Sequence, residues 1–194
     1  MALKTDCMKI IGLVFMLWLG SSCSDGDMVS SDTAAPKSTE KIMDAYKIEP
    51  RANLRSALLG DSDLRGSDLR GANLINANLI NADLRGANLT GVNLTNANLT
   101  NADLRGANLR DANLTNSNMS DSNLYGVTLR DANLFGANLE RTFLRGANLT
   151  GANLTDANLE GAVLTGSILT GAVLKGSILT DAVLTDAKLD GARR

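Results

Sequence analysis

The stretch ADLRGANLTGVNLTNANLTNADLRGANL, residues 82–109, determines the fold because it repeats with two periods at once. Leucine recurs every fifth residue, and the segment ADLRGANL that opens the stretch returns 20 residues later to close it. The five-residue period runs without insertion or deletion from Leu54 to Leu189, and only Met119 replaces leucine in these twenty-eight repeats. The repeating unit is therefore A-(N/D)-L-x-x, with Gly, Asp or Asn most often two places after the leucine.

A five-residue period matches neither an α-helix nor a β-strand, whose side-chain periods are 3.6 and 2 residues. A chain that turns a corner every five residues places every leucine on the inside. Four such sides make a square coil of 20 residues, and the 20-residue recurrence of ADLRGANL supports four sides independently of the five-residue period. The pattern predicts a solenoid whose interior holds the leucines and the small residues two places before them.

From residue 52 to about 192, this array resembles the pentapeptide-repeat family. The resemblance implies an all-β fold, a right-handed quadrilateral β-helix. Twenty-eight repeats over four sides make about seven coils, which span about 30 Å at the ~4.8 Å spacing of neighbouring strands. The resemblance also implies that the leucine and the small residue point inward and that the other three residues of each repeat point outward.

Composition argues against catalysis and against nucleic-acid binding. The chain has no histidine, and its two cysteines, Cys7 and Cys23, both precede the array. A leucine-filled rod offers no pocket in which nucleophiles or carboxylates converge. Residues 51–194 contain 14 basic and 14 acidic side chains, so the array lacks the basic surface that nucleic acids require. We expect no enzymatic activity, no cofactor, no metal and no nucleic-acid partner.

The N-terminal residues 1–22 read as a signal peptide, with Lys4 and Lys9 before an apolar run that ends at Leu19. The run is about half the roughly 20 residues of a membrane-spanning helix. The sequence Leu-Gly-Ser-Ser-Cys that ends at Cys23 resembles a bacterial lipobox, which implies lipidation of Cys23 and membrane attachment through it. Cleavage after Ser22 without lipidation is the alternative. The predicted location is the bacterial cell envelope, as an anchored lipoprotein or a periplasmic protein.

Two short segments separate the signal from the array. Residues 23–37 are polar and poor in large apolar groups, so we expect a flexible tether. Residues 38–51 are interpreted as a helical cap, because Ile42, Met43 and Tyr46 fall on one side of a helix that Pro50 would end. Such a cap would shield the open edge of the first coil. The alternative is that this segment continues the linker.

Two outward columns consist almost entirely of asparagine. The 20-residue period aligns Asn73 with Asn93 and Asn113 on the first side, and Asn78 with Asn98 and Asn118 on the second. Stacked amides can hydrogen-bond along a stack, and asparagine suits corner geometry, so we interpret both columns as structural.

The third side carries the candidate ligand surface, formed by Arg105, Tyr125, Phe143 and Arg145. The functional interpretation is a ladder of guanidinium groups that binds an anionic envelope polymer or lipid headgroups, with the two aromatic rings as stacking platforms. The alternative is that Asp and Arg pair across coils and leave a merely solvated face. Around Arg145 no Asp is available in the sequence pattern to form such a pair.

The last coils replace asparagine before the leucine with β-branched residues, which are Val163, Ile168, Val173, Ile178 and Val183. We interpret this apolar belt as a self-association surface, and the family resemblance implies that two rods can meet end to end through their C-termini. The alternative is that β-branched residues simply strengthen the β-structure.

These features predict a non-catalytic, exported and lipid-anchored scaffold that contacts a protein or an envelope polymer and forms a homodimer through its C-terminal coils. The family resemblance supplies one alternative function, a DNA-mimicking rod that binds topoisomerases and confers quinolone resistance. The neutral array and the signal peptide count against that alternative.

Overall fold

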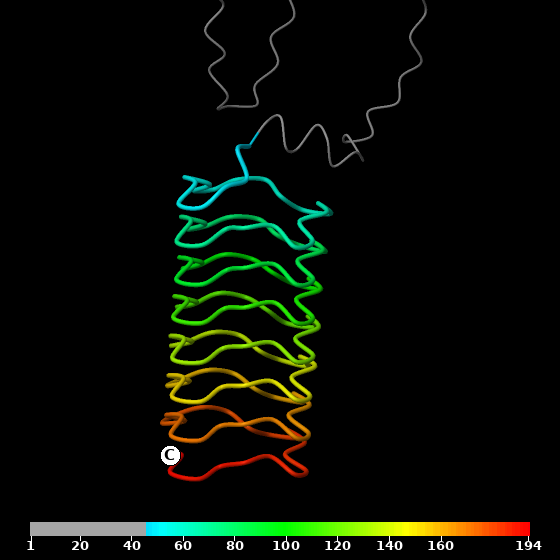
Figure 1. Ribbon diagram of the computed structural model, residues 1–194. Coiled ribbons are helices and arrows are strands. Elements are labelled where there is room, and N and C mark those ends of the chain that lie inside the picture. Colours follow the sequence, from blue (N-terminus) through cyan, green and yellow to red (C-terminus); the bar gives the residue numbers. More distant parts are fainter. Residues whose placement is uncertain (1–45) are drawn as a thin grey trace, which may run out of the picture. The chain divides into compact units, whose positions relative to one another are not determined.

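The structure, a computed structural model, describes residues 46–194 (Figure 1). The predicted signal peptide, Cys23, the tether and nearly all of the helical cap lie outside the described residues and stay predictions. Residues 46–194 contain no helix, and so none long and apolar enough to cross a membrane. The fold of this part is built entirely from β-bridges and turns.

Each side of the coil is a ladder of single-residue parallel β-bridges that join residues 20 apart, and no bridge extends into a longer strand. We name the four sides by their bridging residues. Face 1 runs from Asn53 to Arg193, face 2 from Leu58 to Ile178, face 3 from Asp63 to Val183, and face 4 from Asp68 to Lys188. The ladders confirm the predicted all-β solenoid with four sides and 20 residues per coil (Figure 1).

Backbone hydrogen bonds tie each coil to the next. The amide of a central leucine donates to the following coil, as from Leu74 N to Asn93 O at 2.7 Å. The residue before the leucine donates to the preceding coil, as from Asn73 N to Ala52 O at 2.9 Å. Because every side repeats this pattern, backbone partners satisfy these two amides of each repeat in the middle coils.

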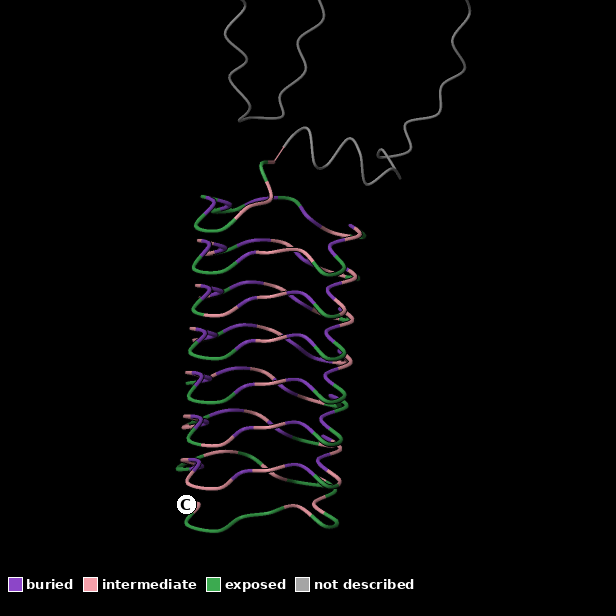
Figure 2. Ribbon diagram, viewed as in Figure 1, coloured by how far each residue is buried: buried purple, intermediate pink, exposed green. Residues whose placement is uncertain are grey.

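The interior is filled by the leucines and by the small residues two places before them. Figure 2 shows buried segments on every coil except the last one. From Leu59 to Leu169 each central side chain is at most 1% exposed. Burying one leucine contributes roughly 1.5–3 kcal/mol before chain entropy is subtracted. Where the small residue is serine or threonine, its hydroxyl donates to the carbonyl three residues earlier in most cases, as from Ser117 Oγ to Leu114 O at 2.8 Å, but not at Ser67 or Ser167. The predicted inward assignment is therefore confirmed.

The corners lie at the residue two places after each leucine, and there φ is positive in every repeat. Asn96 has φ 56° and Gly106 has φ 64°. A positive φ at the third position, with the Ala97 amide bonded to Leu94 O at 3.0 Å across the turn, is the pattern of a type II turn. Glycine, asparagine and aspartate recur at this position because they tolerate positive φ better than other residues do.

The asparagine columns lie at the bridges in the middle of each face, so the expectation that they serve the corners was wrong. Each side chain instead accepts from the residue two places on, as Asn93 Oδ1 accepts from Thr95 N at 3.1 Å and from Thr95 Oγ1 at 2.7 Å. The predicted amide bonds along the stack also occur, for example from Asn158 Nδ2 to Asn138 Oδ1 at 3.2 Å. These side chains are structural because they cap the first amide of each turn.

The two ends of the described part differ. At the N-terminal end Tyr46 and Ile48 pack against the core, and Tyr46 Oη accepts from the amide of Leu58 at 3.1 Å. At the C-terminal end Leu184 is half-buried and Leu189 is 42% exposed. The amides of Leu184 and Leu189 have no acceptor within residues 46–194. The last coil therefore presents an open edge with unpaired backbone donors.

Candidate interaction surfaces

The first three coils of face 3 carry a charged half, defined by Asp63, Arg65, Asp83, Arg85, Asp103 and Arg105. Each Arg donates at least two hydrogen bonds to the Asp of its own repeat. Arg65 Nε donates to Asp63 Oδ1 at 2.8 Å, and Arg65 Nη2 donates to Asp63 Oδ2 at 2.5 Å. Contacts to the next coil are longer, with Arg65 Nε 3.6 Å from Asp83 Oδ2. The expected pairing is present, but its short bonds lie within repeats and not across coils.

This pairing shifts the acid titration of the charged half. Hydrogen bonds from Arg65 lower the pKa of Asp63 from 3.8 to about 2. The hydrogen bond from Arg85 lowers the pKa of Asp83 in the same way. The pairs are solvent-exposed, so each contributes little to stability, but together they leave the charged half without a free guanidinium ladder. Of the predicted ligand residues, Arg105 is thus committed to Asp103.

Further along face 3 lies an apolar half, defined by Tyr125, Phe143, Arg145, Val163 and Val183. The side chain of Tyr125 is 56% exposed and that of Phe143 is 53% exposed. Among residues 46–194 no carboxylate lies within 4.0 Å of the Arg145 guanidinium. The structure therefore brings three of the four predicted ligand residues, Tyr125, Phe143 and Arg145, onto consecutive coils of one face.

The change from Asn to apolar residues also releases backbone donors. Asn123 Oδ1 accepts from the amide of Tyr125 at 3.1 Å. One coil on, Phe143 stands at the position of Asn123 and offers no acceptor, so within the described chain the Arg145 amide is unbonded. The same holds for the amides of Thr165 and Thr185, which follow Val163 and Val183. The apolar half thus combines apolar side chains with free hydrogen-bond donors.

The apolar belt is less uniform than the sequence indicates. Val163, Ile168 and Val173 are half-buried by their neighbours along the ladders. Ile178 and Val183, both in the last coil, are 49% and 44% exposed. The exposed part of the belt is therefore the end of faces 2 and 3, next to the open edge, and on face 3 it is continuous with the apolar half.

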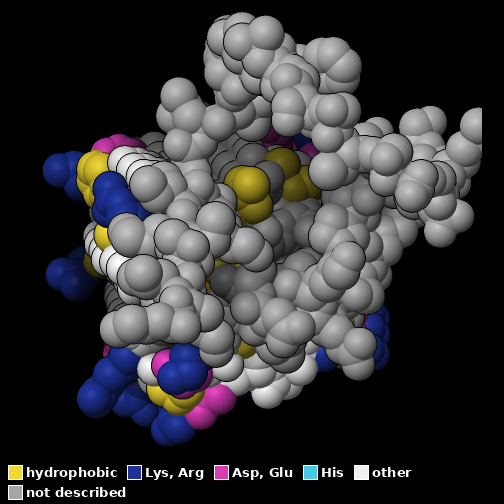
Figure 3. All heavy atoms as spheres, turned by 90° about the horizontal axis from the view of Figure 1, so that it is seen from above, with side chains coloured by type: hydrophobic (Ala, Val, Ile, Leu, Met, Phe, Trp, Pro, Cys, Tyr) yellow, Lys and Arg dark blue, Asp and Glu magenta, His cyan; other side chains and the backbone are white. Residues whose placement is uncertain are grey.

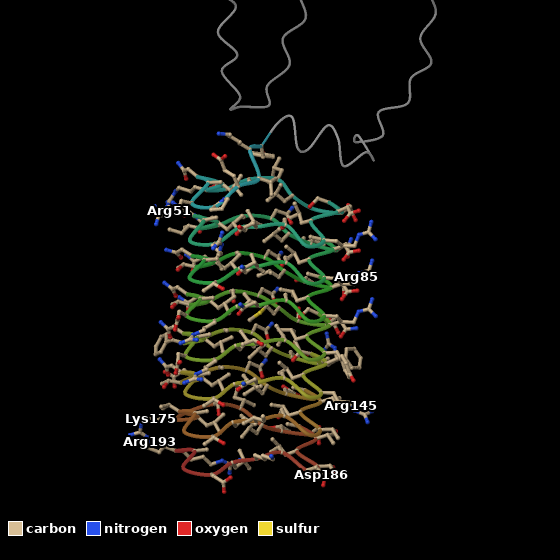
Figure 4. All side chains as sticks on the ribbon, viewed as in Figure 1. Arg51, Arg85, Arg145, Lys175, Asp186 and Arg193 are labelled. Atoms are coloured by element: carbon tan, nitrogen blue, oxygen red, sulfur yellow. The ribbon has the colours of Figure 1, made fainter. Side chains whose placement is uncertain are left out.

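The sequence analysis aligned the outward residues before each leucine into columns 20 residues apart. This alignment missed several exposed side chains. Leu58 on face 2 is 71% exposed and Phe135 on face 1 is 41% exposed. Asp186 was missed because it occupies a corner, where aspartate looks like a turn residue; its φ is 57°. Figure 4 shows that Arg85, Arg145 and Asp186 project from one side of the coil stack, opposite Arg51 and Lys175.

The part of the chain that the structure describes contains no cluster of three or more acidic, His or Cys side chains placed to hold a metal.

An open surface depression lies at the N-terminal corner, lined by Pro50, Arg51, Arg70 and Gly71. Seen along the coil axis from that end, Lys and Arg side chains stand at the outer margin of the molecule (Figure 3). No Lys, Arg, Asp or Glu side chain of residues 46–194 is buried in the leucine interior.

These features define a class of protein, a four-sided β-solenoid of five-residue repeats with a closed interior. The family profile described as pentapeptide repeats matches residues 52–91, 93–131, 129–166 and 157–193. The chain belongs to the pentapeptide-repeat family. No curated protein sequence matches it significantly.

Three solved structures illustrate the similarity. HetL from the cyanobacterium Nostoc sp. strain PCC 7120, a pentapeptide repeat protein involved in heterocyst differentiation regulation, is 35% identical over 73% of this chain and 74% of HetL, with a TM-score of 0.40. A pentapeptide repeat protein from the Arabidopsis thaliana thylakoid lumen is 34% identical over 54% of this chain and 66% of that one, with a TM-score of 0.32. QnrB1, a plasmid-mediated fluoroquinolone resistance protein, is 21% identical over 68% of this chain and 77% of QnrB1, with a TM-score of 0.51. At that identity the likeness to QnrB1 concerns the fold alone.

Proposed function

We propose that this pentapeptide-repeat protein is a non-catalytic scaffold of the bacterial cell envelope, exported and attached to the membrane through lipidated Cys23. It contacts a protein or an envelope polymer through the apolar half of face 3 and self-associates through its C-terminal coils. The observation that carries the interaction role is the apolar half itself. There, exposed aromatic side chains and an uncompensated guanidinium replace the paired residues of the charged half. Tyr, Phe and Arg are the residue types enriched at protein interfaces.

A scaffold role fits the closed interior. Leucine and alanine side chains fill the axis from end to end of the middle coils, so no substrate-sized cavity lies inside them. The outward polar groups are largely engaged with one another, as in the bonds of Asn93 with Thr95 and of Asp63 with Arg65. Catalysis needs groups that converge on a reacting atom, whereas these side chains diverge from a convex surface.

Export and lipid attachment rest on the sequence around Cys23. The decisive experiment is the intact mass of the protein from membrane and soluble fractions, for the wild type and for Cys23→Ser. We expect a membrane-bound wild type that begins at Cys23 and carries a diacylglyceryl group, and a Cys23→Ser protein without that added mass. A soluble, unmodified wild type that begins near Cys23 would overturn the lipid anchor but retain export.

The same measurement separates this proposal from the topoisomerase alternative. A DNA mimic acts in the cytoplasm and needs a continuous acidic face. Asp63, Asp83 and Asp103, the carboxylates at the bridges of face 3, are each bonded to an arginine, which argues against a continuous acidic face there. An uncleaved chain in the cytoplasm would overturn export and favour the alternative.

A further inference from the structure

We propose that the partner of the apolar half is a second copy of this chain, packed side by side and antiparallel through face 3. This inference rests on the self-association proposed above, but not on export or lipid attachment. It differs from end-to-end association because the contact uses the flat side of the rod instead of its open edge. The apolar half reaches the last coil and contains its exposed Val183, so this contact also covers the exposed face-3 part of the belt.

The apolar half is self-complementary about one coil. A two-fold axis that lies between two antiparallel rods reverses the order of their coils. A coil that lies one step before the axis in one rod therefore faces the coil that lies one step after the axis in the other rod. Phe143, Val163 and Val183 follow one another in the same ladder, one coil apart. If the axis passes at Val163, this side chain contacts its own copy in the partner, and Phe143 contacts Val183 of the partner. The exposed phenyl ring thus meets an exposed β-branched side chain.

The same axis compensates the lone guanidinium. Arg145 lies one coil before Thr165, and Thr185 lies one coil after it, directly before the corner residue Asp186. Arg145 therefore comes opposite Thr185 of the partner and beside its Asp186, and the symmetry makes this ion pair twice. Neither residue has an oppositely charged side chain within 4.0 Å in residues 46–194. Figure 4 shows both projecting from the same side of the stack.

Other registers fit less well. An axis one coil earlier, at Phe143, would set Arg145 against its own copy and bring like charges together, which is unfavourable. An axis one coil later, at Val183, would leave Arg145 beyond the end of the partner. With the axis at Val163, Tyr125 lies just past the last coil of the partner, next to its open edge. The hydroxyl of Tyr46 already binds an edge amide at the opposite end of the chain.

The contact is small. Three coils at ~4.8 Å extend about 15 Å along the axis, so the buried area falls short of the ~800 Å² per partner of a standard stable interface. The dimer should therefore be weak and visible only as a concentration dependence. The ionic contacts set the register, and the apolar side chains contribute most of the affinity.

The first test is sedimentation equilibrium over a wide concentration range, with the full chain carrying Cys7→Ser and Cys23→Ser in mild detergent. We expect the weight-average mass to rise towards that of a dimer. Arg145→Glu and Asp186→Arg should each raise the dissociation constant about tenfold or more, and the double variant should return it close to that of the parent. Arg105→Glu is the matched control in the charged half and should have little effect, because Arg105 lies outside the contact.

The second test uses geometry. Facing sheets lie ~10 Å apart, which exceeds the reach of a disulfide, so Thr165→Cys should form dimers with a short bis-maleimide cross-linker. Thr150→Cys on face 4 should not form cross-linked dimers.

A wild type that stays monomeric at every concentration would overturn the proposal. A double charge variant whose dissociation constant is as high as that of either single variant would also overturn it. So would dimerisation that Leu189→Asp abolishes and Arg145→Glu leaves intact, because that result assigns the contact to the open edge. None of these outcomes changes the mass of the processed protein, so this test is independent of the test of export.

Discussion

The charged half and the apolar half of face 3 have the same backbone but opposite outward chemistry. Asp83 and Phe143 occupy the same ladder of bridges, and Arg85 and Arg145 occupy the same turn position. In the charged half the Asp side chain bonds both the Arg side chain and the Arg amide, as Asp83 Oδ1 accepts from Arg85 N at 3.2 Å. In the apolar half neither bond is available to Arg145. The comparison teaches that the inward residues specify the fold, while the outward residues are free to serve either stability or recognition.

The largest effect on folding stability is expected from placing a charge in the core. The effect should differ between a middle coil and the last coil. Leu104, in the charged half, is 0% exposed, so Leu104→Asp buries an unpaired carboxylate. Its cost should exceed the stability of a typical domain, and the chain should not fold. Leu184→Asp lies in the half-buried last coil beside the open edge and should fold. Circular dichroism during thermal unfolding distinguishes the two. A folded Leu104→Asp variant would contradict the inward assignment.

The fold was predictable because the inward pattern is periodic and the physics is local. Twenty-eight repeats with an apolar side chain at one spacing leave only a chain that turns every five residues, and the recurrence of ADLRGANL sets four sides. The corner position was harder to assign. Asparagine is common both at the bridge, as in Asn93, and at the corner, as in Asn96, and only the backbone angle φ separates the two roles.

The candidate surface was predictable in part. Sorting by columns found Tyr125, Phe143 and Arg145 because they interrupt a repeated pattern. It could not show that Arg105 bonds within its own repeat, since the choice between Asp103 and an Asp of another coil depends on side-chain geometry. It also passed over Asp186, because a corner aspartate is indistinguishable in sequence from a turn former.

An intermediate effect on the free energy of unfolding is expected from removing the asparagine that caps a turn at position 123 and from introducing one at position 143. Asn123→Ala removes the acceptor of the Tyr125 amide and should lower the free energy of unfolding by about 1 kcal/mol. Phe143→Asn introduces the missing acceptor for the Arg145 amide and should raise it by a few tenths of a kcal/mol, because the lost aromatic contacts offset part of the gain. Denaturant unfolding measures both. Two changes of the same sign would refute the capping role of this column.

A smaller effect is expected from the buried hydroxyls. Ser117 Oγ donates to Leu114 O, whereas Ser167 Oγ, near the C-terminal end, has no partner within the described chain. Ser117→Ala should therefore lower the free energy of unfolding by up to about 1 kcal/mol, and Ser167→Ala should leave it unchanged or raise it slightly. The same unfolding measurement decides this pair. Equal losses in the two variants would mean that Ser167 finds a partner in solution.

The smallest effect is the pH dependence of stability that Asp63 of the charged half contributes through its pairing with Arg65. Because Arg65 lowers the pKa of Asp63 to about 2, the folded chain binds this proton less readily than the unfolded chain does. The resulting stability is present above the ordinary carboxyl pKa near 4 and is lost as the pH falls towards 2. Unfolding curves between pH 5 and pH 2 should therefore be less steeply pH-dependent in Asp63→Asn than in the wild type. Arg145→Gln is the control in the apolar half, and it should leave the pH dependence unchanged because no carboxylate of the described chain pairs with Arg145. If Arg145→Gln flattened the curve as Asp63→Asn does, the two halves would not differ in the way their contacts indicate.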